Sequence, residues 1–362
     1  MTTTLPPLVI GDLVAPIPVV QAGMGLRVAM SNLAAAVART GAVGCISSVG
    51  MGTFERSLDD YITESNDKLA WEIRNARRLA PNGILAVNAM VAMSNYNEII
   101  RVCVREEVDI IISGAGLPLN LPELTAGSAV KIVPVVSSAR AMNVILRTWH
   151  RRYQVMPDAV VIEGPKCGGH LGFRRDQIDH PETVALPKLL EEIRAVLAPY
   201  EEEYGRRIPL LGAEEVVSAD DVLTMLQLGF DGAHVGTRFI CTTESGLARA
   251  SKEVWAGASA ADVVVIKSPL GMPVRVLRTP LVERLLNGER IPFQCPFQCL
   301  RACEAGKVNF CIADALVHTY FGHTERGLYM TGCAVDKVND IISVDSFFEP
   351  LKRMIEPSHE CA

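Results

Sequence analysis

The residues with the clearest chemical potential form a glycine-rich turn that carries one histidine. An apolar, β-branched segment at 158–162 is followed by Glu163-Gly164-Pro165-Lys166-Cys167-Gly168-Gly169-His170-Leu171-Gly172. Glycines let the backbone approach a flat ligand closely. An imidazole with an ordinary pKa of about 6.5 can accept or release a proton near neutral pH. The turn therefore predicts a ligand site in which His170 is the catalytic residue.

The elements that must position this turn alternate regularly along the chain. Eight short apolar segments are typical of buried strands: Ile17–Gln21, Val43–Ser47, Ile84–Asn88, Asp109–Ser113, Lys131–Val136, Asp158–Glu163, Ile208–Gly212 and Asp231–Gly236. Between them lie helix-compatible stretches: Asn32–Thr40, Leu69–Ala80, Asn97–Glu107, Ala139–Tyr153, Leu186–Tyr204 and Ala219–Leu228. The alternation predicts an α/β protein with a (β/α)₈ TIM barrel. An open doubly wound sheet is the alternative, because a count of strands does not establish closure.

The alternation ends after the eighth predicted strand. Residues 242–310 contain helix-length stretches and a turn-rich run at 268–273, which predict a small helical lid or insertion with a cysteine-containing segment. The helix-like pieces Ala313–Phe321 and Ile341–Ile355 then return to the barrel as a C-terminal helical extension. We therefore expect a barrel made of residues 1–241 and 311–362, with 242–310 as the lid.

Composition excludes several classes of protein. The chain has 362 residues, of which 49% are hydrophobic and 21% charged, so it can bury a large core. Its net charge of −6 is spread along the sequence, which argues against nucleic acid and membrane surfaces as partners. No apolar run is long enough to span a bilayer, and 1–12 lacks the pattern of a signal peptide. We expect a cytoplasmic protein with reduced cysteines.

Polar residues and glycines gather where the predicted strands end. These ends are Gln21-Ala22-Gly23-Met24-Gly25, Asn88, Ser113-Gly114-Ala115-Gly116 and Gly236-Thr237-Arg238. In a barrel they meet at one mouth, where the glycines leave room for a broad planar ligand and Gln21 and Asn88 can hydrogen-bond its polar edge. The backbone N–H groups after strands seven and eight, at Gly212-Ala213 and Gly236-Thr237, favour a phosphate. Glu214 and Glu215 must then point away, because a carboxylate repels a phosphate.

These motifs resemble the FMN-dependent nitronate monooxygenase family, formerly called 2-nitropropane dioxygenases, whose superfamily includes FMN-dependent enoyl-acyl-carrier-protein reductases. The resemblance runs in order from about residue 15 to about 280, and the turn at Gly168-Gly169-His170 is its most specific element. The sequence departs from the family pattern in two places. Ala213-Glu214 stands where the family has a glycine pair, and Lys166 and Cys167 lie in a turn where small residues are common.

The resemblance implies non-covalently bound FMN and a set of contacts. His170 stands beside the flavin ring as the catalytic residue. The cofactor-binding residues are Gln21, Ala22, Gly23, Met24, Asn88, Glu163, Gly168, Gly169, Gly212, Ala213, Gly236 and Thr237. The implied reaction is oxidation of an alkyl nitronate with O₂ to a carbonyl compound and nitrite. In that reaction the cofactor performs the redox step, and the protein supplies position and electrostatics.

The alternative activity is that of an FMN- and NAD(P)H-dependent enoyl-thioester reductase, and a non-catalytic flavin-binding barrel is a third. No dinucleotide fingerprint is present, but such reductases bind the nucleotide over the flavin without one. Its absence therefore hardly discriminates between nitronate oxidation and enoyl-thioester reduction. A homodimer is left open. We prefer nitronate oxidation because it is the commoner assignment for this motif set.

Several other residues have two interpretations each. His234 could face the barrel interior, although a core role is favoured. Lys166 could attract an anionic substrate, although a solvated lysine is favoured, and Cys167 is expected to fill a tight turn. Arg275 is expected to anchor the lid. Cys295, Cys299, Cys303 and Cys311 could hold a soft metal, but they lack CxxC pairs, so packing thiols and no metal site are predicted.

Overall fold

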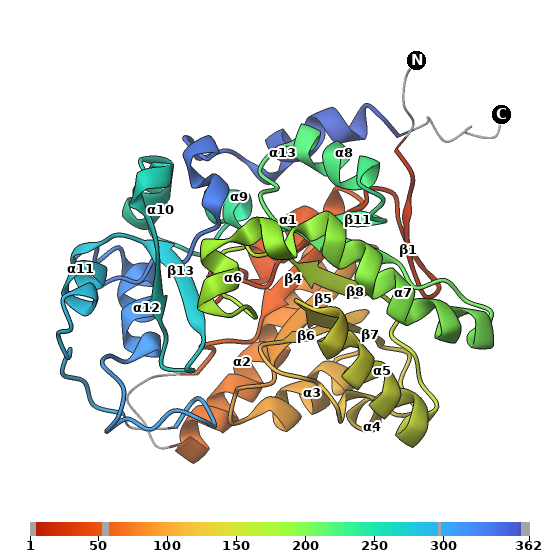
Figure 1. Ribbon diagram of the computed structural model, residues 1–362, viewed down its shortest axis with the longest axis horizontal. Coiled ribbons are helices and arrows are strands. Elements are labelled where there is room, and N and C mark those ends of the chain that lie inside the picture. Colours follow the sequence, from red (N-terminus) through yellow and green to blue (C-terminus); the bar gives the residue numbers. More distant parts are fainter. Residues whose placement is uncertain (1–4, 53–57, 296–297, 356–362) are drawn as a thin grey trace.

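The computed structural model describes residues 5–52, 58–295 and 298–355. His359, and Pro296 and Phe297 of the cysteine-containing segment, lie outside this part of the chain. At its centre is a closed barrel of eight parallel strands (Figure 1). In barrel order these are β3 (Val19–Gln21), β4 (Val43–Ser47), β5 (Ile84–Met90), β6 (Ile110–Gly114), β7 (Lys131–Val136), β8 (Val160–Glu163), β10 (Leu210–Ala213) and β11 (Gly232–Val235). The predicted (β/α)₈ barrel is thus confirmed, and the open sheet is excluded.

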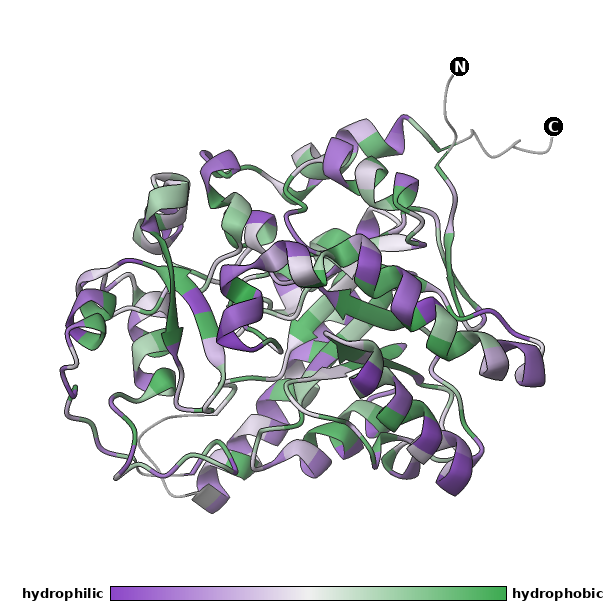
Figure 2. Ribbon diagram, viewed as in Figure 1, coloured by the Kyte–Doolittle hydropathy of each residue, from purple (hydrophilic) through white to green (hydrophobic). Residues whose placement is uncertain are grey.

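Closure depends on the pairing of the last strand with the first. His234 of β11 lies in register with Val20 of β3, and Gly212 of β10 with Ala233 of β11. Each barrel strand is almost completely buried, because one face points into the barrel and the other packs against helices. Figure 2 shows this arrangement as apolar strands surrounded by helices whose outer faces are polar.

The helices that cover the barrel are α1 (Ser31–Arg39), α2 (Leu58–Leu79), α3 (Tyr96–Arg105), α4 (Leu121–Leu124), α5 (Ala139–Tyr153), α7 (Leu186–Tyr204), α8 (Ala219–Gln227) and α13 (Val344–Lys352). Capping interactions determine where several of these helices begin and end. Ser138 caps α5 by accepting from the N–H of Ala141, Ser218 and Asp221 form a capping box on α8, and α7 ends at Gly205 with a φ of +61°. Helix α2 begins eleven residues before the predicted Leu69, and only Leu58, Tyr61 and Ile62 are apolar in this added part.

The predicted lid, residues 242–310, contains strands as well as the helices that the sequence predicted. Its helices are α10 (Arg249–Ala256) and α11 (Pro280–Leu286), and its strands are β12 (Val263–Lys267) and β13 (Pro273–Leu277). Helix α12 (Ile312–Phe321), which we expected to return to the barrel, packs against α10 and belongs with the lid. The β-branched run at 263–266 pairs antiparallel with β13. The third strand of this sheet is β9 (Gly169–His170), which comes from the barrel. In Figure 1 these elements lie together on one side of the barrel.

The C-terminal segment fastens the lid and the barrel to each other. Arg238 is buried, and its guanidinium donates to Asp340 Oδ1 at 2.6 Å and to the Cys241 carbonyl at 2.8 Å. Phe347 and Phe348 of α13 pack against Phe239, with ring centroids 5.1 and 5.8 Å apart. Helix α13 therefore occupies the place of the barrel's eighth covering helix, between α1 and α8.

Before the barrel, a hairpin of β1 (Leu8–Ile10) and β2 (Leu13–Ala15) turns at Gly11, and the sequence did not predict it.

Across the described residues, every helix is too short or too polar to cross a bilayer.

Gly44 provides a test of the packing between α1 and β4. A Cβ at this position would lie 1.9 Å from the Ala34 carbonyl oxygen, and this backbone cannot move without displacing α1. We predict that Gly44→Ala lowers the free energy of unfolding by roughly 3 kcal/mol, measured by chemical denaturation. Gly306→Ala is the matched control, because nothing lies within 4 Å of a Cβ there. An equal effect of both substitutions would contradict this account.

Candidate functional site

The glycine-rich turn joins the barrel to the lid sheet. After β8 the chain turns and forms β9, in which Gly169 pairs with Arg275 and His170 with Val274. Gly169 has a φ of +74°, which favours glycine, and a Cβ on Gly168 would lie 2.5 Å from the Thr331 carbonyl carbon. The glycines are therefore required for the turn and for close packing against the C-terminal segment.

His170 is held by the lid. Its Nε2 lies 3.1 Å from Oγ of Ser268, a buried residue in the turn between β12 and β13. The same Oγ accepts the N–H of Leu270 at 3.2 Å and has a second lone pair that can accept the proton of Nε2. In that tautomer Ser268 holds the ring through Nε2, and Nδ1 is the basic nitrogen. Ser268 was missed in the sequence because it lies 98 residues from His170.

The charge state of His170 differs from the expectation of an ordinary pKa. Burial disfavours the imidazolium and lowers the pKa of His170 to about 4. The imidazole is therefore neutral at pH 7. In this state one ring nitrogen can accept a proton, and His170 becomes an imidazolium acid only after it has done so.

His170 lies on a cavity of about 420 Å³ at the mouth of the barrel. All but two of the predicted site residues line this cavity: Ala22, Gly23, Met24, Asn88, Glu163, Gly168, Gly169, His170, Ala213, Gly236 and Thr237. They come from the C-terminal ends of β3, β5, β8, β10 and β11 and the loops that follow. Parallel closure of the barrel brings these ends to one mouth.

The two exceptions are Gln21 and Gly212. The Gln21 amide is completely buried away from the cavity, where Nε2 donates to the Cys45 carbonyl at 2.8 Å and Oε1 accepts the Cys45 N–H at 3.2 Å. Gln21 thus joins β3 to β4, and the expectation that its amide meets a ligand is wrong. Gly212 faces outward, since a Cβ there would lie 2.8 Å from Met225 Sδ of α8. The alternation of side chains along a strand places the following residue, Ala213, on the cavity.

The two glutamates after β10 do not point away as expected, for both line the cavity. Glu214 Oε1 accepts the backbone N–H of Lys166 at 2.6 Å, and Lys166 Nζ forms an ion pair with Glu215 Oε2 at 2.8 Å. Burial raises the pKa of Glu214, which reduces its negative charge. Lys166 therefore balances the acidic pair and is not a freely solvated lysine.

Cys167 and Arg275 hold the turn together. The Cys167 thiol is buried and donates to the Ala213 carbonyl at 2.6 Å, and burial raises its pKa well above the ordinary value. Arg275, which is also buried, donates to the Cys167 carbonyl. Arg275 thus joins β13 to the turn, in agreement with its predicted role as an anchor of the lid.

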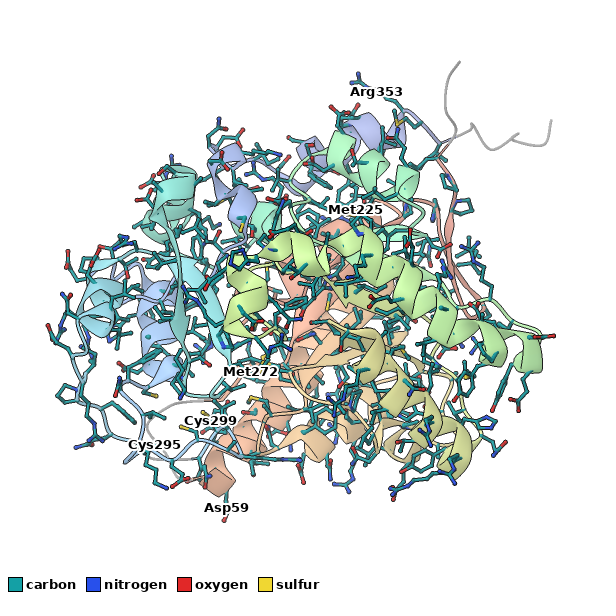
Figure 3. All side chains as sticks on the ribbon, viewed as in Figure 1. Asp59, Met225, Met272, Cys295, Cys299 and Arg353 are labelled. Carbon is teal, nitrogen blue, oxygen red and sulfur yellow. The ribbon has the colours of Figure 1, made fainter. Side chains whose placement is uncertain are left out.

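The remaining wall of the cavity is apolar and comes from the lid and the C-terminal segment. Its residues include Leu247, Trp255, Leu270, Met272, Leu300, Leu316, Leu328 and Met330. Figure 3 labels Met272 and Cys299, which approach the cavity from the β12–β13 turn and from the segment after α11. These residues are spread over more than eighty positions without a motif, so no signal in the sequence identifies them as a group.

The cysteine-containing segment also reaches the cavity. The Cys299 carbonyl accepts the Ser94 N–H at 3.0 Å, and the Arg301 N–H donates to the Ala92 carbonyl at 2.9 Å. Cys299 lines the cavity, and burial together with neighbouring thiols raises its pKa to about 12. Within residues 5–52, 58–295 and 298–355, no group of three or more His, Cys, Asp or Glu side chains is arranged to hold a metal ion.

Comparison with known proteins identifies the family. The model of the nitronate monooxygenase family matches residues 65–353, which is most of the chain. The chain belongs to the nitronate monooxygenase family. Members of this family are flavoenzymes of the oxidoreductase class, and the family agrees with the resemblance that the sequence motifs indicated.

The sequence identity to individual relatives is low. The chain is 26% identical over 273 residues to (3aS,4S,5R,7aS)-5-hydroxy-7a-methyl-1-oxo-octahydro-1H-indene-4-carboxyl-CoA dehydrogenase of Mycobacterium tuberculosis, covering 75% of this chain and 66% of that protein. It is 24% identical over 170 residues to a probable nitronate monooxygenase of Staphylococcus aureus, covering 47% and 45%. The chain thus spans less than two thirds of the length of these curated relatives.

Solved structures support the same fold. FabK from Thermotoga maritima superposes with a TM-score of 0.72 at 24% identity, covering 94% of this chain and 93% of that one. Nitroalkane oxidase from Streptomyces ansochromogenes gives a TM-score of 0.70 at 18% identity, covering 94% and 96%. At these identities the likeness establishes the fold alone.

The cavity meets the requirements of a flavin ring. Gly236 leaves its side of the mouth open, since a Cβ there would have only Ala22 and Met24 near it, at 3.5 Å or more. Deeper in the barrel, the buried Nε2 of His234 has no hydrogen-bond partner among the described residues. A flat, largely apolar ligand with a polar edge would fill the space between the glycines and satisfy such a group.

The neutrality of His170 can be tested directly. We predict that the imidazole signals of His170 in ¹⁵N-NMR spectra remain those of a neutral ring from pH 8 down to about pH 5, because burial lowers the pKa of His170 to about 4. A His170→Asn variant assigns the signals. A titration midpoint between pH 6 and 7 would show that the site is more hydrated than the structure indicates.

Proposed function

We propose that this protein is an FMN-dependent enzyme that oxidises alkyl nitronates with O₂ to a carbonyl compound and nitrite. The observation that carries the proposal is the cavity of about 420 Å³ at the barrel mouth, which is formed by glycine-bearing strand ends and has the imidazole of His170 on its wall. Bound FMN supplies the acceptor for the substrate's electrons and their transfer to oxygen. The family and its flavin chemistry support this proposal.

The residues that would hold FMN are those on the barrel side of the cavity. The backbone of Ala22, Gly23 and Met24 offers close approach to a ring, and Asn88 offers an amide next to it. Thr237 is the first residue of the short helix α9 (Thr237–Ile240), so its N–H has no partner within the helix and can meet a phosphate. Thr237 Oγ already accepts the Gly332 N–H at 3.2 Å, which keeps this end of the site in place.

His170 would act on the carbon next to the nitro group. A neutral imidazole accepts a proton from this carbon and converts a nitroalkane to the nitronate, with Ser268 holding the ring in orientation. The apolar lid side chains, such as Trp255 and Met272, exclude water from the same space. A nitronate already lacks this proton, so His170 is needed less for nitronate than for nitroalkane.

A second candidate is a flavin-dependent reaction on an acyl thioester, with NAD(P)H as the reductant. The specific observation is the apolar wall formed by Trp255, Leu316 and Met330, which is more extensive than a short nitroalkane requires. The name of the carboxyl-CoA dehydrogenase relative also favours this candidate.

Anaerobic reduction separates the two candidates. We predict that a nitronate bleaches the flavin absorbance of the FMN-loaded protein, whereas NADH and NADPH do not, because the first candidate draws its electrons from the nitronate. The measurement is the visible spectrum after anaerobic mixing. Bleaching by NADH or NADPH and not by nitronate would select the thioester reaction, and a protein that takes up no FMN would exclude both.

Substitutions at His170 and Ser268 test the proton transfer. We predict that His170→Asn lowers kcat/KM for a nitroalkane by roughly 10²–10⁴ and for the corresponding nitronate much less, since general base catalysis supplies a factor of this size. Ser268→Ala should lower kcat/KM for the nitroalkane roughly tenfold and alter its pH profile, and Ser268→Thr should restore both. Equal losses on both substrates would argue against a role as base.

A further inference from the structure

The chemistry above makes no use of a group of cysteines in the segment between α11 and α12. They are Cys295, Cys299, Cys303 and Cys311, and Figure 3 labels the first two. Cys299, Cys303 and Cys311 carry reduced thiols, and Cys295 is exposed at the surface. Among the described residues, these thiols are not arranged around a common centre as metal ligands would be. Reaction of the thiols with each other is therefore the chemistry to consider.

The segment that carries these cysteines is held together without regular secondary structure. Its described residues form neither helix nor strand between the end of α11 at Leu286 and the start of α12 at Ile312. A loop of this length in a compact domain usually has a function. The loop is closed near its two ends, where the Ile291 N–H donates to the Asn309 carbonyl at 2.7 Å. This closure brings Cys311, which follows Asn309 closely, back to the beginning of the cysteine-containing segment.

Cys299 and Cys311 lie close to each other beside the same cavity. Cys299 itself lines the cavity, and so does Ile312, the residue directly after Cys311. Burial and then the neighbouring thiols raise the pKa of Cys299 to about 12, and Cys311 has the largest effect among these thiols. The interaction between two ionisable groups weakens with distance, so the two sulfur atoms are near neighbours. The two thiols are therefore suited to form a disulfide bond with each other.

The two cysteines belong to different parts of the structure. Cys299 is fastened to the barrel loop after β5, because its carbonyl accepts the Ser94 N–H at 3.0 Å. Cys311 is the N-cap residue of α12, a lid helix that packs against α10. Helix α10 carries Trp255 of the apolar cavity wall, and α12 carries Leu316. A bond between the two sulfur atoms would thus tie the lid to the barrel at the cavity wall.

We propose that Cys299 and Cys311 are a modification site, at which a low-molecular-weight disulfide such as glutathione disulfide oxidises the two thiols to a disulfide bond. The bond joins α12 of the lid to the barrel loop after β5. Reduced thiols leave noncovalent contacts alone between these two elements, whereas the disulfide restricts their separation. This inference does not depend on the identity of the cofactor or of the substrate.

The exposed Cys295 is the entry point for the oxidant, since Cys299 and Cys311 are only partly accessible. Its thiolate attacks the external disulfide, which forms a mixed disulfide and releases one thiolate. Cys311 is within reach of Cys295, because burial and, less strongly, the Cys295 thiol raise the pKa of Cys311.

Two exchange steps then complete the oxidation. Cys311 attacks the Cys295 sulfur, which forms a bond between these two cysteines and releases the second external thiolate. Cys299 next attacks the Cys311 sulfur, which forms the final bond and returns Cys295 to a thiol. In total two cysteine thiols lose two electrons and two protons, and one external disulfide is reduced to two thiols.

Peptide mapping of the oxidised full-length protein tests the proposal. The reduced protein is incubated with glutathione disulfide at pH 8 without oxygen, its remaining thiols are blocked with N-ethylmaleimide, and its peptides are analysed by mass spectrometry without reduction. We expect one bond, between Cys299 and Cys311, with release of two glutathione molecules per chain and reversal by dithiothreitol. Amide hydrogens of α12 should exchange at least roughly threefold more slowly in the oxidised protein, because the bond limits local opening.

Serine variants assign the role of each thiol. Cys299→Ser and Cys311→Ser should each abolish the bond and the slower exchange. Cys295→Ser should form the same bond roughly tenfold more slowly, because the exposed entry thiol is gone. Cys303→Ser is the matched control, since it removes a thiol of the same segment that lies outside the proposed pair, and it should oxidise like wild type. Circular dichroism of each reduced variant checks that it folds.

Wild type alone can overturn the proposal, so the test holds even if a variant does not fold. The pair is wrong if the bond joins other cysteines, such as Cys295 and Cys303, or if Cys299 and Cys311 stay reduced after Cys295 has reacted with glutathione. A zinc or iron ion held by the reduced protein and released by N-ethylmaleimide would show that the thiols bind a metal instead. Oxidation of Cys295→Ser at the wild-type rate would exclude the entry step.

Discussion

The antiparallel pairing of β9 with β13 is the interaction on which the rest of the site depends. It is short, because Gly169 and His170 are its only barrel-side residues, but it joins a barrel loop to the lid sheet. The N–H of Leu171 extends it by donating to the Pro273 carbonyl at 2.9 Å, and Arg275 fastens the same strand to the turn. Through this pairing the lid supplies Ser268 to His170 and closes an apolar wall over the cavity. Without this pairing, His170 would lie on a solvated loop, and its imidazole would have an ordinary pKa.

Desolvation is the second constraint, and it acts on both histidines of the cavity and on Glu163 and Glu214. It keeps the imidazoles of His170 and His234 neutral and favours the uncharged form of Glu163. The acidic side chains after β10 are paired instead. Lys166 Nζ forms an ion pair with Glu215, and the backbone N–H of Lys166 donates to Glu214. A site of this kind suits redox chemistry on a bound planar cofactor, since the protein adds few net charges of its own near the ring. The family of flavoenzymes to which the chain belongs agrees with this character.

The segment after the barrel completes the site from several directions. Helix α13 and the Arg238–Asp340 pair secure the C-terminal segment to the barrel, and the same segment places Thr331 and Gly332 against the glycine-rich turn. The cysteine-containing segment lies against the loop after β5, and Cys299 and Leu300 form part of the cavity wall. Lid and C-terminal segment therefore act as one cover, although they are separate along the chain.

Much of the barrel was determined by sequence alone, because parallel strands buried on both faces leave uninterrupted β-branched runs such as Lys131–Val136. Their ends carry most of the cavity-lining residues, since closure brings all eight ends to one mouth. The alternation of side chains decided the exceptions: Gln21 faces Cys45 and Gly212 faces α8, whereas Ala213 and His234 face the cavity. Only tertiary structure could place Ser268 on His170 or assemble the lid sheet, because these contacts join residues about a hundred positions apart. It also decided the charge of His170, since the pKa of an imidazole depends on how much water surrounding segments exclude.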